Sequence, residues 1–251
     1  MEDTLFLSND LLFYTIEGEG KYAGYPSLFM RLSMCNLTCK GFASKDSPNG
    51  CDSYISWSVK NRKTFEEIFQ AMEVLDPYTF ENWVTKLKQG AIFKITGGEP
   101  FIQQKSLIAF IKAFIERYKF TPIIDFETNG TILPDEYWTN TVKATFTCSP
   151  KLSNNGDPED KRYKPDVLKS LTKHGACFKF VVRTEQDMRE VIDKYVNYIN
   201  IPKELVWLMP MCGSRDEQSE VSHGVAELCK KYNYKFSPRL HLMIWDKALK
   251  V

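Results

Sequence analysis

Three cysteines close together in the first part of the chain have the residue type and spacing that hold a metal. They are Cys35, Cys39 and Cys51, with three residues between the first pair and eleven between the second. Structural zinc takes four closed ligands, and the three histidines all lie beyond position 170. A cubane iron–sulfur cluster normally has four cysteine ligands, so three would leave one iron open to a substrate or cofactor. We favour this second interpretation.

A second candidate segment is the turn Gly97-Gly98-Glu99-Pro100, which follows a predicted strand. Glycines let backbone approach a ligand, and backbone groups together with the Glu99 carboxylate can accept hydrogen bonds from an ammonium group. Alone, the turn is equally consistent with an ordinary strand-to-helix connection. Beside an open iron it suits S-adenosylmethionine, whose amino and carboxylate groups can chelate the iron while an electron enters the sulfonium.

Alternating strands and helices must position these residues. Predicted strands cover residues 4–15, 27–33, 91–96, 122–127, 144–148, 178–182 and 206–209, and predicted helices start at Thr64 or cover 76–90, 106–118 and 221–231. Thr64 with Glu67 three residues later predicts a capping box. Because turns suited to ligands follow several strands, we predict an α/β fold, a partial TIM-type barrel of mostly parallel strands with outer helices.

The composition is that of an ordinary globular protein, with 251 residues, 43% hydrophobic and 26% charged. We expect one domain over residues 1–251, with a polar inserted loop at about 40–50. The net charge of +1 predicts no direct nucleic-acid partner. No basic-then-apolar leader precedes the acidic start, and no apolar run approaches the roughly 18 residues that span a bilayer. We therefore expect a cytoplasmic protein without a membrane partner.

The remaining thiols and one strand lysine have several interpretations. Cys148, Cys177 and Cys229 lie in apolar strand or helix settings, which predicts core positions. Cys212 follows a predicted strand and could face a pocket, but a core or rim position is favoured. Lys179 could reach an anion inside a barrel, and a partly buried salt bridge is the equal alternative.

Further short motifs accompany these segments along most of the chain. They are FYTIEGEG (13–20), GYP (24–26), FMRLS (29–33), CNL (35–37), CDS (51–53), TGGEP (96–100), ETNGT (127–131) and SPK (149–151). In this combination the chain resembles the radical S-adenosylmethionine superfamily and, within it, the 7-carboxy-7-deazaguanine synthase family. The superfamily turn is common, whereas the combination is specific.

The resemblance implies how the cofactors are held. Cys35, Cys39 and Cys51 would ligate a [4Fe-4S] cluster. Ser53 stands where the family has a threonine whose hydroxyl binds Mg²⁺, and the hydroxyl is retained. The residues implied for S-adenosyl-L-methionine are Gly50, Cys51, Asp52, Gly98, Glu99, Ser149, Pro150 and Lys151.

The resemblance also implies a pterin substrate, which would meet Ile16, Glu17, Gly18, Arg31 and Thr96. Arg31, otherwise an ordinary strand-edge or surface residue, would pair with the substrate carboxylate. The implied lyase reaction converts 6-carboxy-5,6,7,8-tetrahydropterin to 7-carboxy-7-deazaguanine with loss of ammonia, in queuosine-type biosynthesis. We assign no catalytic residue beyond these ligands. A reductant protein such as flavodoxin and a homodimer are expected as partners.

The chain departs from the family pattern at three points. Eleven residues separate Cys39 from Cys51 where the superfamily has two, and a polar excursion of this kind has a modest entropic cost. Glu17 replaces a typical glutamine, and Met34 replaces the usual glycine before the first cysteine. Two alternatives stay open: a glycyl-radical activase, against which Arg31 favours a small carboxylated substrate, and a zinc-binding module that recognises nucleic acid.

Overall fold

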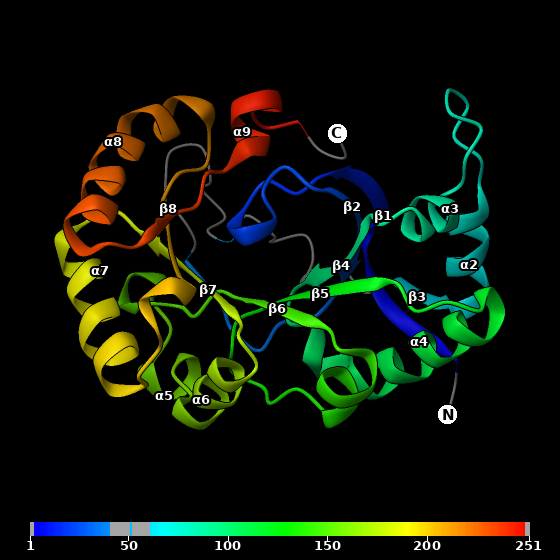
Figure 1. Cartoon of the computed structure of the whole chain (residues 1–251), viewed down its shortest axis with the longest axis horizontal. Helices are drawn as coiled ribbons and strands as arrows, with labels where there is room; N and C mark the ends of the chain where they lie inside the picture. Colours follow the sequence, from blue (N-terminus) through cyan, green and yellow to red (C-terminus); the bar gives the residue numbers. More distant parts are fainter. Residues whose placement is uncertain (1–2, 41–50, 52–60, 249–251) are drawn as a thin grey trace.

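Figure 1 shows the chain as a computed structural model, which describes residues 3–40, 51 and 61–248. The described part forms a curved sheet with helices around its outer side. The strands are β1 (Thr4–Ile16), β2 (Pro26–Leu32), β3 (Asn61–Thr64), β4 (Ile92–Gly97), β5 (Ile123–Thr128), β6 (Thr145–Cys148), β7 (Cys177–Val182), β8 (Val206–Pro210) and β9 (Lys235–Phe236).

The strand order confirms the predicted fold class. Within the described residues it runs β3-β1-β2-β4-β5-β6-β7-β8-β9 in one sheet. β1 pairs with β2 and with β3 in antiparallel fashion, and every pair from β2–β4 to β8–β9 is parallel. Because β3 and β9 are edges that do not pair with each other, the barrel is open, as the term partial implies.

The helices lie mainly outside the curve of the sheet (Figure 1). They are α2 (Phe65–Glu73), α3 (Trp83–Lys88), α4 (Gln104–Tyr118), α5 (Glu159–Arg162), α6 (Pro165–Lys173), α7 (Glu185–Glu190), α8 (Arg215–Tyr232) and α9 (Leu240–Trp245). The 3-10 and π helices are η1 (Gly20–Tyr22), η2 (Pro100–Gln103), η3 (Tyr137–Val142), η4 (Ser153–Asn155), η5 (Val191–Tyr198) and η6 (Lys203–Leu205).

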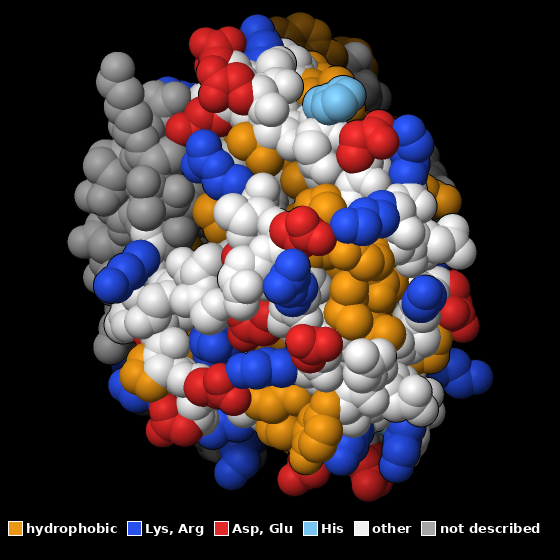
Figure 2. Space-filling model, turned by 90° about the vertical axis from the view of Figure 1, so that its left-hand side faces the viewer, with side chains coloured by type: hydrophobic (Ala, Val, Ile, Leu, Met, Phe, Trp, Pro, Cys, Tyr) orange, Lys and Arg blue, Asp and Glu red, His pale blue; other side chains and the backbone are white. Residues whose placement is uncertain are grey.

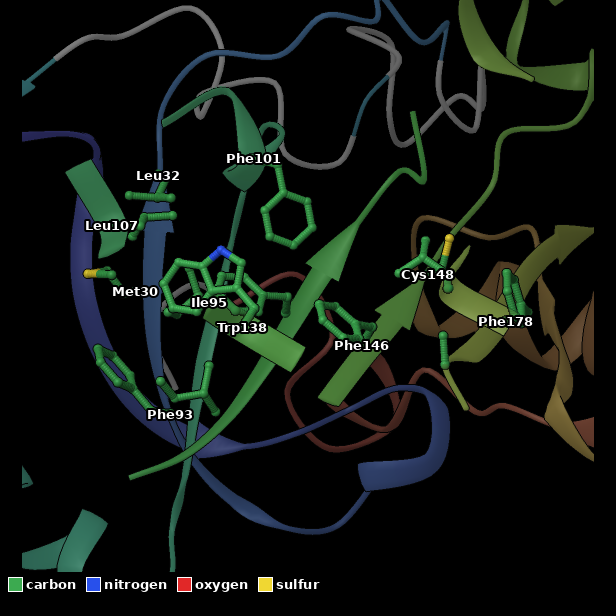
Figure 3. Close-up of a cluster of buried hydrophobic side chains, with 14 of the residues drawn as sticks. Met30, Leu32, Phe93, Ile95, Phe101, Leu107, Trp138, Phe146, Cys148 and Phe178 are labelled. Atoms are coloured by element: carbon green, nitrogen blue, oxygen red, sulfur yellow. The ribbon is translucent and has the colours of Figure 1, made fainter. Parts of the chain in front are cut away.

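Side chains alternate between the two faces of each inner strand, as the pleat requires. On β4, Phe93 and Ile95 join the main apolar core, while Lys94 and Thr96 have the opposite parity. Figure 3 shows part of this core, where Phe93 and Ile95 lie near Trp138 and Met30. The convex face is therefore packed against helices, and the concave face is available for a site.

Local signals explain how the helices begin. The predicted capping box is confirmed, because the Thr64 hydroxyl accepts the Glu67 N–H at 3.2 Å and the Glu67 carboxylate accepts the Thr64 N–H at 2.8 Å. The helix predicted over 76–90 is wrong in its first half, since only α3 forms there. The Asp76 carboxylate instead accepts the N–H groups of Tyr78 and Thr79, both at 2.9 Å, which folds this segment into a turn.

The last long helix is longer than predicted. α8 begins at Arg215 rather than Val221, because the Ser214 hydroxyl accepts the Glu217 N–H at 3.3 Å and caps it. Figure 2 views the side of the molecule on which α7 and α8 lie, where charged side chains of both signs alternate with apolar patches. A Lys231–Glu185 ion pair of 3.0 Å joins these two helices. None of the described helices has the length and apolar character that crossing a bilayer requires.

Candidate active site

A pocket of about 340 Å³ brings most of the predicted site residues together. The predicted residues that line it are Ile16, Glu17, Gly18, Arg31, Cys35, Cys39, Cys51, Thr96, Gly98, Ser149 and Lys151. Glu99 and Pro150 are not among its lining residues. Gly50, Asp52 and Ser53, together with most of the predicted inserted loop, lie outside the described residues, so their roles stay predictions.

One part of the pocket, which we call the thiol end, is formed by Cys35, Cys39 and Cys51, all partly buried. The Asn155 side-chain amide donates to Cys39 Sγ at 3.0 Å, and the Asn129 amide nitrogen lies 3.9 Å from Cys35 Sγ. Amide donors aimed at sulfur stabilise its thiolate form, so this donor set fits a thiolate-ligated iron cluster.

The thiol end does not display a preformed metal site. Over the ranges that the structure describes, no three His, Cys, Asp or Glu side chains are gathered closely enough to hold a metal ion. Burial raises the pKa of the Cys35 thiol, which favours the protonated form. A bound metal would remove that proton, because the ligand to a metal is the thiolate. Ligation by all three cysteines remains a prediction.

The glycine turn after β4 packs directly against the loop that holds the first cysteine. A Cβ at Gly97 would lie 2.0 Å from the Leu32 carbonyl oxygen, and one at Gly98 would lie 1.9 Å from that of Met34. Two backbone hydrogen bonds, Gly98 N–H to Leu32 at 3.1 Å and Glu99 N–H to Met34 at 2.8 Å, join the same segments. Glycine is required here by close backbone approach, which fixes the start of the cysteine loop beside the turn.

Glu99 is fully buried behind this turn. Its carboxylate accepts the Thr128 hydroxyl at 2.9 Å and the backbone N–H groups of Asn129 and Phe101 at 2.8 and 3.2 Å. Burial raises the pKa of Glu99 to about 7, and these hydrogen bonds oppose the rise. Glu99 therefore ties the β4 turn to the end of β5, from which Asn129 reaches toward Cys35. Its predicted contact with a cofactor ammonium is untested.

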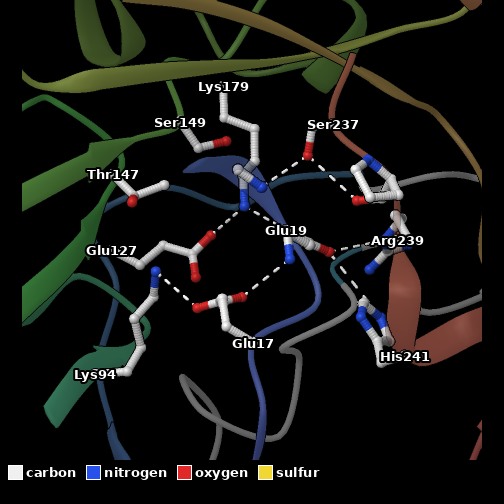
Figure 4. Close-up of polar contacts among 12 residues, drawn as sticks. Glu17, Glu19, Lys94, Glu127, Thr147, Ser149, Lys179, Ser237, Arg239 and His241 are labelled. Carbon is white, nitrogen blue, oxygen red and sulfur yellow. Dashed lines mark hydrogen bonds and ion pairs between the residues drawn. The ribbon is translucent and has the colours of Figure 1, made fainter. Parts of the chain in front are cut away.

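A network of charged side chains on the strands and the adjoining segments lies at and behind another part of the pocket lining, and most of it is shown in Figure 4. We call it the charged wall and define it as Glu17, Glu19, Lys94, Asp125, Glu127, Lys179 and Arg239. Each lysine in it is 1% exposed and is paired with two carboxylates. Buried charges of this kind are retained only when they are paired, so their positions are strongly constrained.

The contacts of Lys179 decide between its two interpretations, a contact with an anion inside the barrel and a salt bridge. Its ammonium lies 2.5 Å from the Glu127 carboxylate and also pairs with Glu19, so the partly buried salt bridge is observed, although Lys179 also lines the pocket. Burial alone would raise the pKa of Glu127, but Lys179 and Lys94 hold it at about 2. Arg239 donates to Glu19 at 2.9 Å, which ties the C-terminal segment to the wall.

The run from Glu17 to Gly20 is closed by that same C-terminal segment. The Leu240 N–H donates to the Gly18 carbonyl at 2.9 Å, and the Ser237 hydroxyl accepts the Gly20 N–H at 2.8 Å. A Cβ at Gly18 would lie 2.3 Å from His241 Nδ1, so glycine is needed for this packing. His241, which the sequence left unassigned, lines the pocket.

Two predicted substrate residues lie side by side. Arg31 on β2 and Thr96 on β4 are register partners in the parallel pair, and both line the pocket. The Arg31 guanidinium lies 5.6 Å from the centre of the Phe13 ring, which in turn stacks on Phe29 at 4.9 Å. This stacking keeps a cation beside a flat aromatic surface.

The structure also shows where the other four cysteines lie, and it contains one buried lysine that the sequence did not predict. Cys148, Cys177, Cys212 and Cys229 are all buried, which confirms the core interpretation. Lys94 was not foreseen, although its parity in the strand AIFKIT, opposite to Phe93 and Ile95, was a usable signal.

The fold is similar to that of a solved structure described as QueE from Escherichia coli, with a TM-score of 0.59, 19% identity and 93% of each chain covered. No protein-family model matches the chain. An open barrel of mostly parallel strands, with three thiols beside a glycine turn at one pocket, has the features expected of a radical S-adenosylmethionine enzyme.

Curated relatives narrow this class. The chain is 30% identical to a 7-carboxy-7-deazaguanine synthase of Hyperthermus butylicus, over 93% of this chain and 90% of the relative. A 7-carboxy-7-deazaguanine synthase of Halobacterium salinarum is also 30% identical, over 94% and 90%. The chain therefore belongs to the 7-carboxy-7-deazaguanine synthase family.

Proposed function

We propose that the chain converts 6-carboxy-5,6,7,8-tetrahydropterin to 7-carboxy-7-deazaguanine with loss of ammonia, as a lyase of queuosine-type 7-deazapurine biosynthesis. The observation that carries the proposal is that one pocket is lined by Cys35, Cys39 and Cys51 and also by Arg31 and the aromatic ring of Phe13. A metal cluster and a flat carboxylated substrate therefore fit the same cavity.

The substrate would lie between the aromatic surface and the charged wall. Phe13 and Phe29 offer a stacked apolar face for a bicyclic ring. Arg31 supplies two parallel N–H donors for the carboxylate, and Thr96 supplies a hydroxyl beside it. Ile16, Glu17 and Gly18 would contact the remaining ring edge. Enclosure by these groups and the C-terminal segment keeps water away from the reacting atoms.

The cofactors would be held at the thiol end. Cys35, Cys39 and Cys51 would ligate the [4Fe-4S] cluster, and S-adenosyl-L-methionine would contact Gly98, Ser149 and Lys151. When bound, these two groups supply the radical that abstracts hydrogen from the substrate. The remaining proposed cofactor contacts are Gly50, Asp52, Glu99 and Pro150, with Ser53 for Mg²⁺. We also propose a cytoplasmic homodimer that receives electrons from a protein such as flavodoxin.

The test is anaerobic reconstitution followed by product analysis. We expect about four irons per chain. Incubation with S-adenosylmethionine, Mg²⁺, dithionite and the carboxylated pterin should give 5′-deoxyadenosine and 7-carboxy-7-deazaguanine by mass spectrometry. 5′-Deoxyadenosine without the deazaguanine would retain the enzyme class and remove the proposed substrate. A colourless protein with one tightly bound zinc and no cofactor cleavage would overturn the whole proposal.

A further inference from the structure

Lys94 is a buried cation to which the proposed function gives no task. It lies in the middle of β4 with 1% of its surface exposed. Its ammonium is 2.8 Å from the Glu17 carboxylate and 2.8 Å from the Asp125 carboxylate. Lys94 does not line the pocket, whereas Glu17 does. Any effect of Lys94 on a ligand must therefore pass through a neighbour.

The two carboxylates that flank Lys94 differ in their other contacts. Asp125 is register partner to Lys94 and accepts the hydroxyls of Thr145 and Thr147 at 2.6 and 2.9 Å. It is therefore well satisfied inside the sheet. Glu17 accepts one backbone N–H, that of Glu19, at 3.1 Å through Oε1.

The second oxygen of Glu17 has unused capacity. Glu17 Oε2 is buried, and the Lys94 ammonium lies 2.8 Å from it. A carboxylate oxygen has two acceptor positions, so contact with Lys94 leaves a second position for another donor. Because Glu17 is 4% exposed and lines the pocket, a ligand with N–H donors could use that capacity.

Lys94 stabilises the charged form of Glu17 at this buried position. A carboxylate buried so deeply without a cation would be strongly destabilising. Lys179, the other buried lysine of the charged wall, is already paired with Glu19 and Glu127. Burial raises the pKa of Glu17, and Lys94 opposes that rise most strongly among its neighbours.

We propose that Lys94 is a positioning residue for substrate recognition: it holds Glu17 as a carboxylate at the pocket wall, where Glu17 accepts ring N–H donors of the bound substrate. A reduced pterin presents several such donors on its two rings. The inference rests on the proposed function, because the substrate class comes from there. It adds a recognition pair, Glu17 with Lys94. This pair favours a ligand ring that presents N–H donors to the carboxylate over a ring that presents acceptors.

A double-mutant cycle on the reconstituted holoenzyme tests this proposal. The four proteins are the wild type, Lys94→Met, Glu17→Met and the double variant. Methionine at position 17 keeps the length of the side chain and removes both acceptor oxygens. KM and kcat for the carboxylated pterin are measured by product formation. We expect each single substitution to raise KM about tenfold or more, with a smaller change in kcat, as for loss of a ground-state contact. In the Glu17→Met background, Lys94→Met should add little.

The cycle separates a positioning role from a structural one. If Lys94→Met raises KM by the same factor in both backgrounds, Lys94 acts independently of Glu17 and the inference is wrong. An exposed control is Arg117→Met, which removes a cation paired with Glu66 at 2.7 Å away from the pocket lining. Its KM should match the wild type.

Two further outcomes are also decisive. If the wild type forms no deazaguanine, the proposed function fails, and this inference fails with it. If it is active but Lys94→Met does not fold, Lys94→Gln takes its place in the cycle, with thermal unfolding as the check. Should neither variant fold, Glu17→Met alone decides, and an unchanged KM in that variant overturns the inference.

Discussion

The thiol end and the charged wall share one pocket but are built differently. The thiols and the amides beside them, Cys35, Cys39, Asn129 and Asn155, come from segments beyond the strands or from the short turn η4. Most charges of the wall come from inner strands, where the pleat fixes each side chain to the concave side. Loops thus supply reactive groups, while strands supply fixed charges.

This difference indicates which part tolerates change. The eleven-residue interval before Cys51 lies almost wholly outside the described residues, and the sequence predicts a polar loop there, in which inserted residues would not alter a strand register. An insertion in β4 would instead turn Lys94 to the opposite face, because one residue reverses the parity of a strand. Variation in spacing is therefore compatible with a constant charged wall.

The largest effect is expected from removing a thiol. Cys35→Ala, Cys39→Ala and Cys51→Ala should each reduce iron binding after anaerobic reconstitution and abolish cleavage of S-adenosylmethionine, because each removes a proposed cluster ligand. Iron content and 5′-deoxyadenosine are the measurements. Cys229→Ala is the matched control, since this buried thiol lies in α8, and it should keep its iron. An iron content equal to that of the wild type in Cys51→Ala would show that Cys51 is not a cluster ligand.

The sequence predicted the thiol end better than the charged wall. Closely spaced cysteines and a glycine turn are local patterns, and alternating strands and helices predicted the open barrel. The wall joins residues that are distant in sequence: Lys179 meets Glu19 across 160 positions, and Arg239 meets Glu19 across 220. No local pattern reports such pairs. The parity of Lys94 within its strand was a usable local signal, but its pairing with Glu17 and Asp125 was not visible in the sequence.

The second prediction tests whether the charged wall is structural. Lys179→Met should lower the free energy of unfolding by about 3 kcal/mol, because it leaves the partly buried carboxylates Glu19 and Glu127 without their shared cation. Urea unfolding measures the change. Lys194→Met removes a partly exposed lysine paired with Glu159 and should cost less than about 1 kcal/mol. Equal costs for the two variants would contradict a structural role for the wall.

The third prediction concerns Glu99, which links the glycine turn to β5. Its pKa is about 7 in the folded chain, against 4.5 for an ordinary glutamate. Between pH 4.5 and about 7, the Glu99 carboxyl has lost its proton in the unfolded chain but keeps it in the folded chain. The free energy of unfolding therefore falls by about 3 kcal/mol as pH rises through this range. Below pH 4.5 the whole of this stabilisation is present.

Glu99→Gln removes this titration while keeping the size of the side chain. Relative to the wild type, the variant should gain about 3 kcal/mol in free energy of unfolding between pH 4.5 and pH 8. Urea unfolding at a series of pH values measures the difference. If the difference in free energy of unfolding between the two proteins does not change with pH, the pKa of Glu99 is not raised by burial.

The smallest effect is expected at Met34, where the thiol end joins β2. Met34 has a φ of 76°, in the left-handed region that favours glycine. Its carbonyl accepts the Glu99 N–H at 2.8 Å, and this bond does not depend on the side chain. Met34→Gly should therefore relieve backbone strain and raise the free energy of unfolding by about 1 kcal/mol.

Met243 provides the matched control for this substitution. It is 54% exposed within α9, where glycine is unfavourable, so Met243→Gly should lower the free energy of unfolding by about 1 kcal/mol. Urea unfolding of both variants measures the opposite signs. A lower free energy of unfolding in Met34→Gly would mean that the packing contacts of the Met34 side chain stabilise the fold by more than the strained backbone destabilises it. In that case side-chain packing would hold the junction between β2 and the thiol end, as it holds the strands. The difference between the loop-built thiol end and the strand-built charged wall would then begin only after Met34.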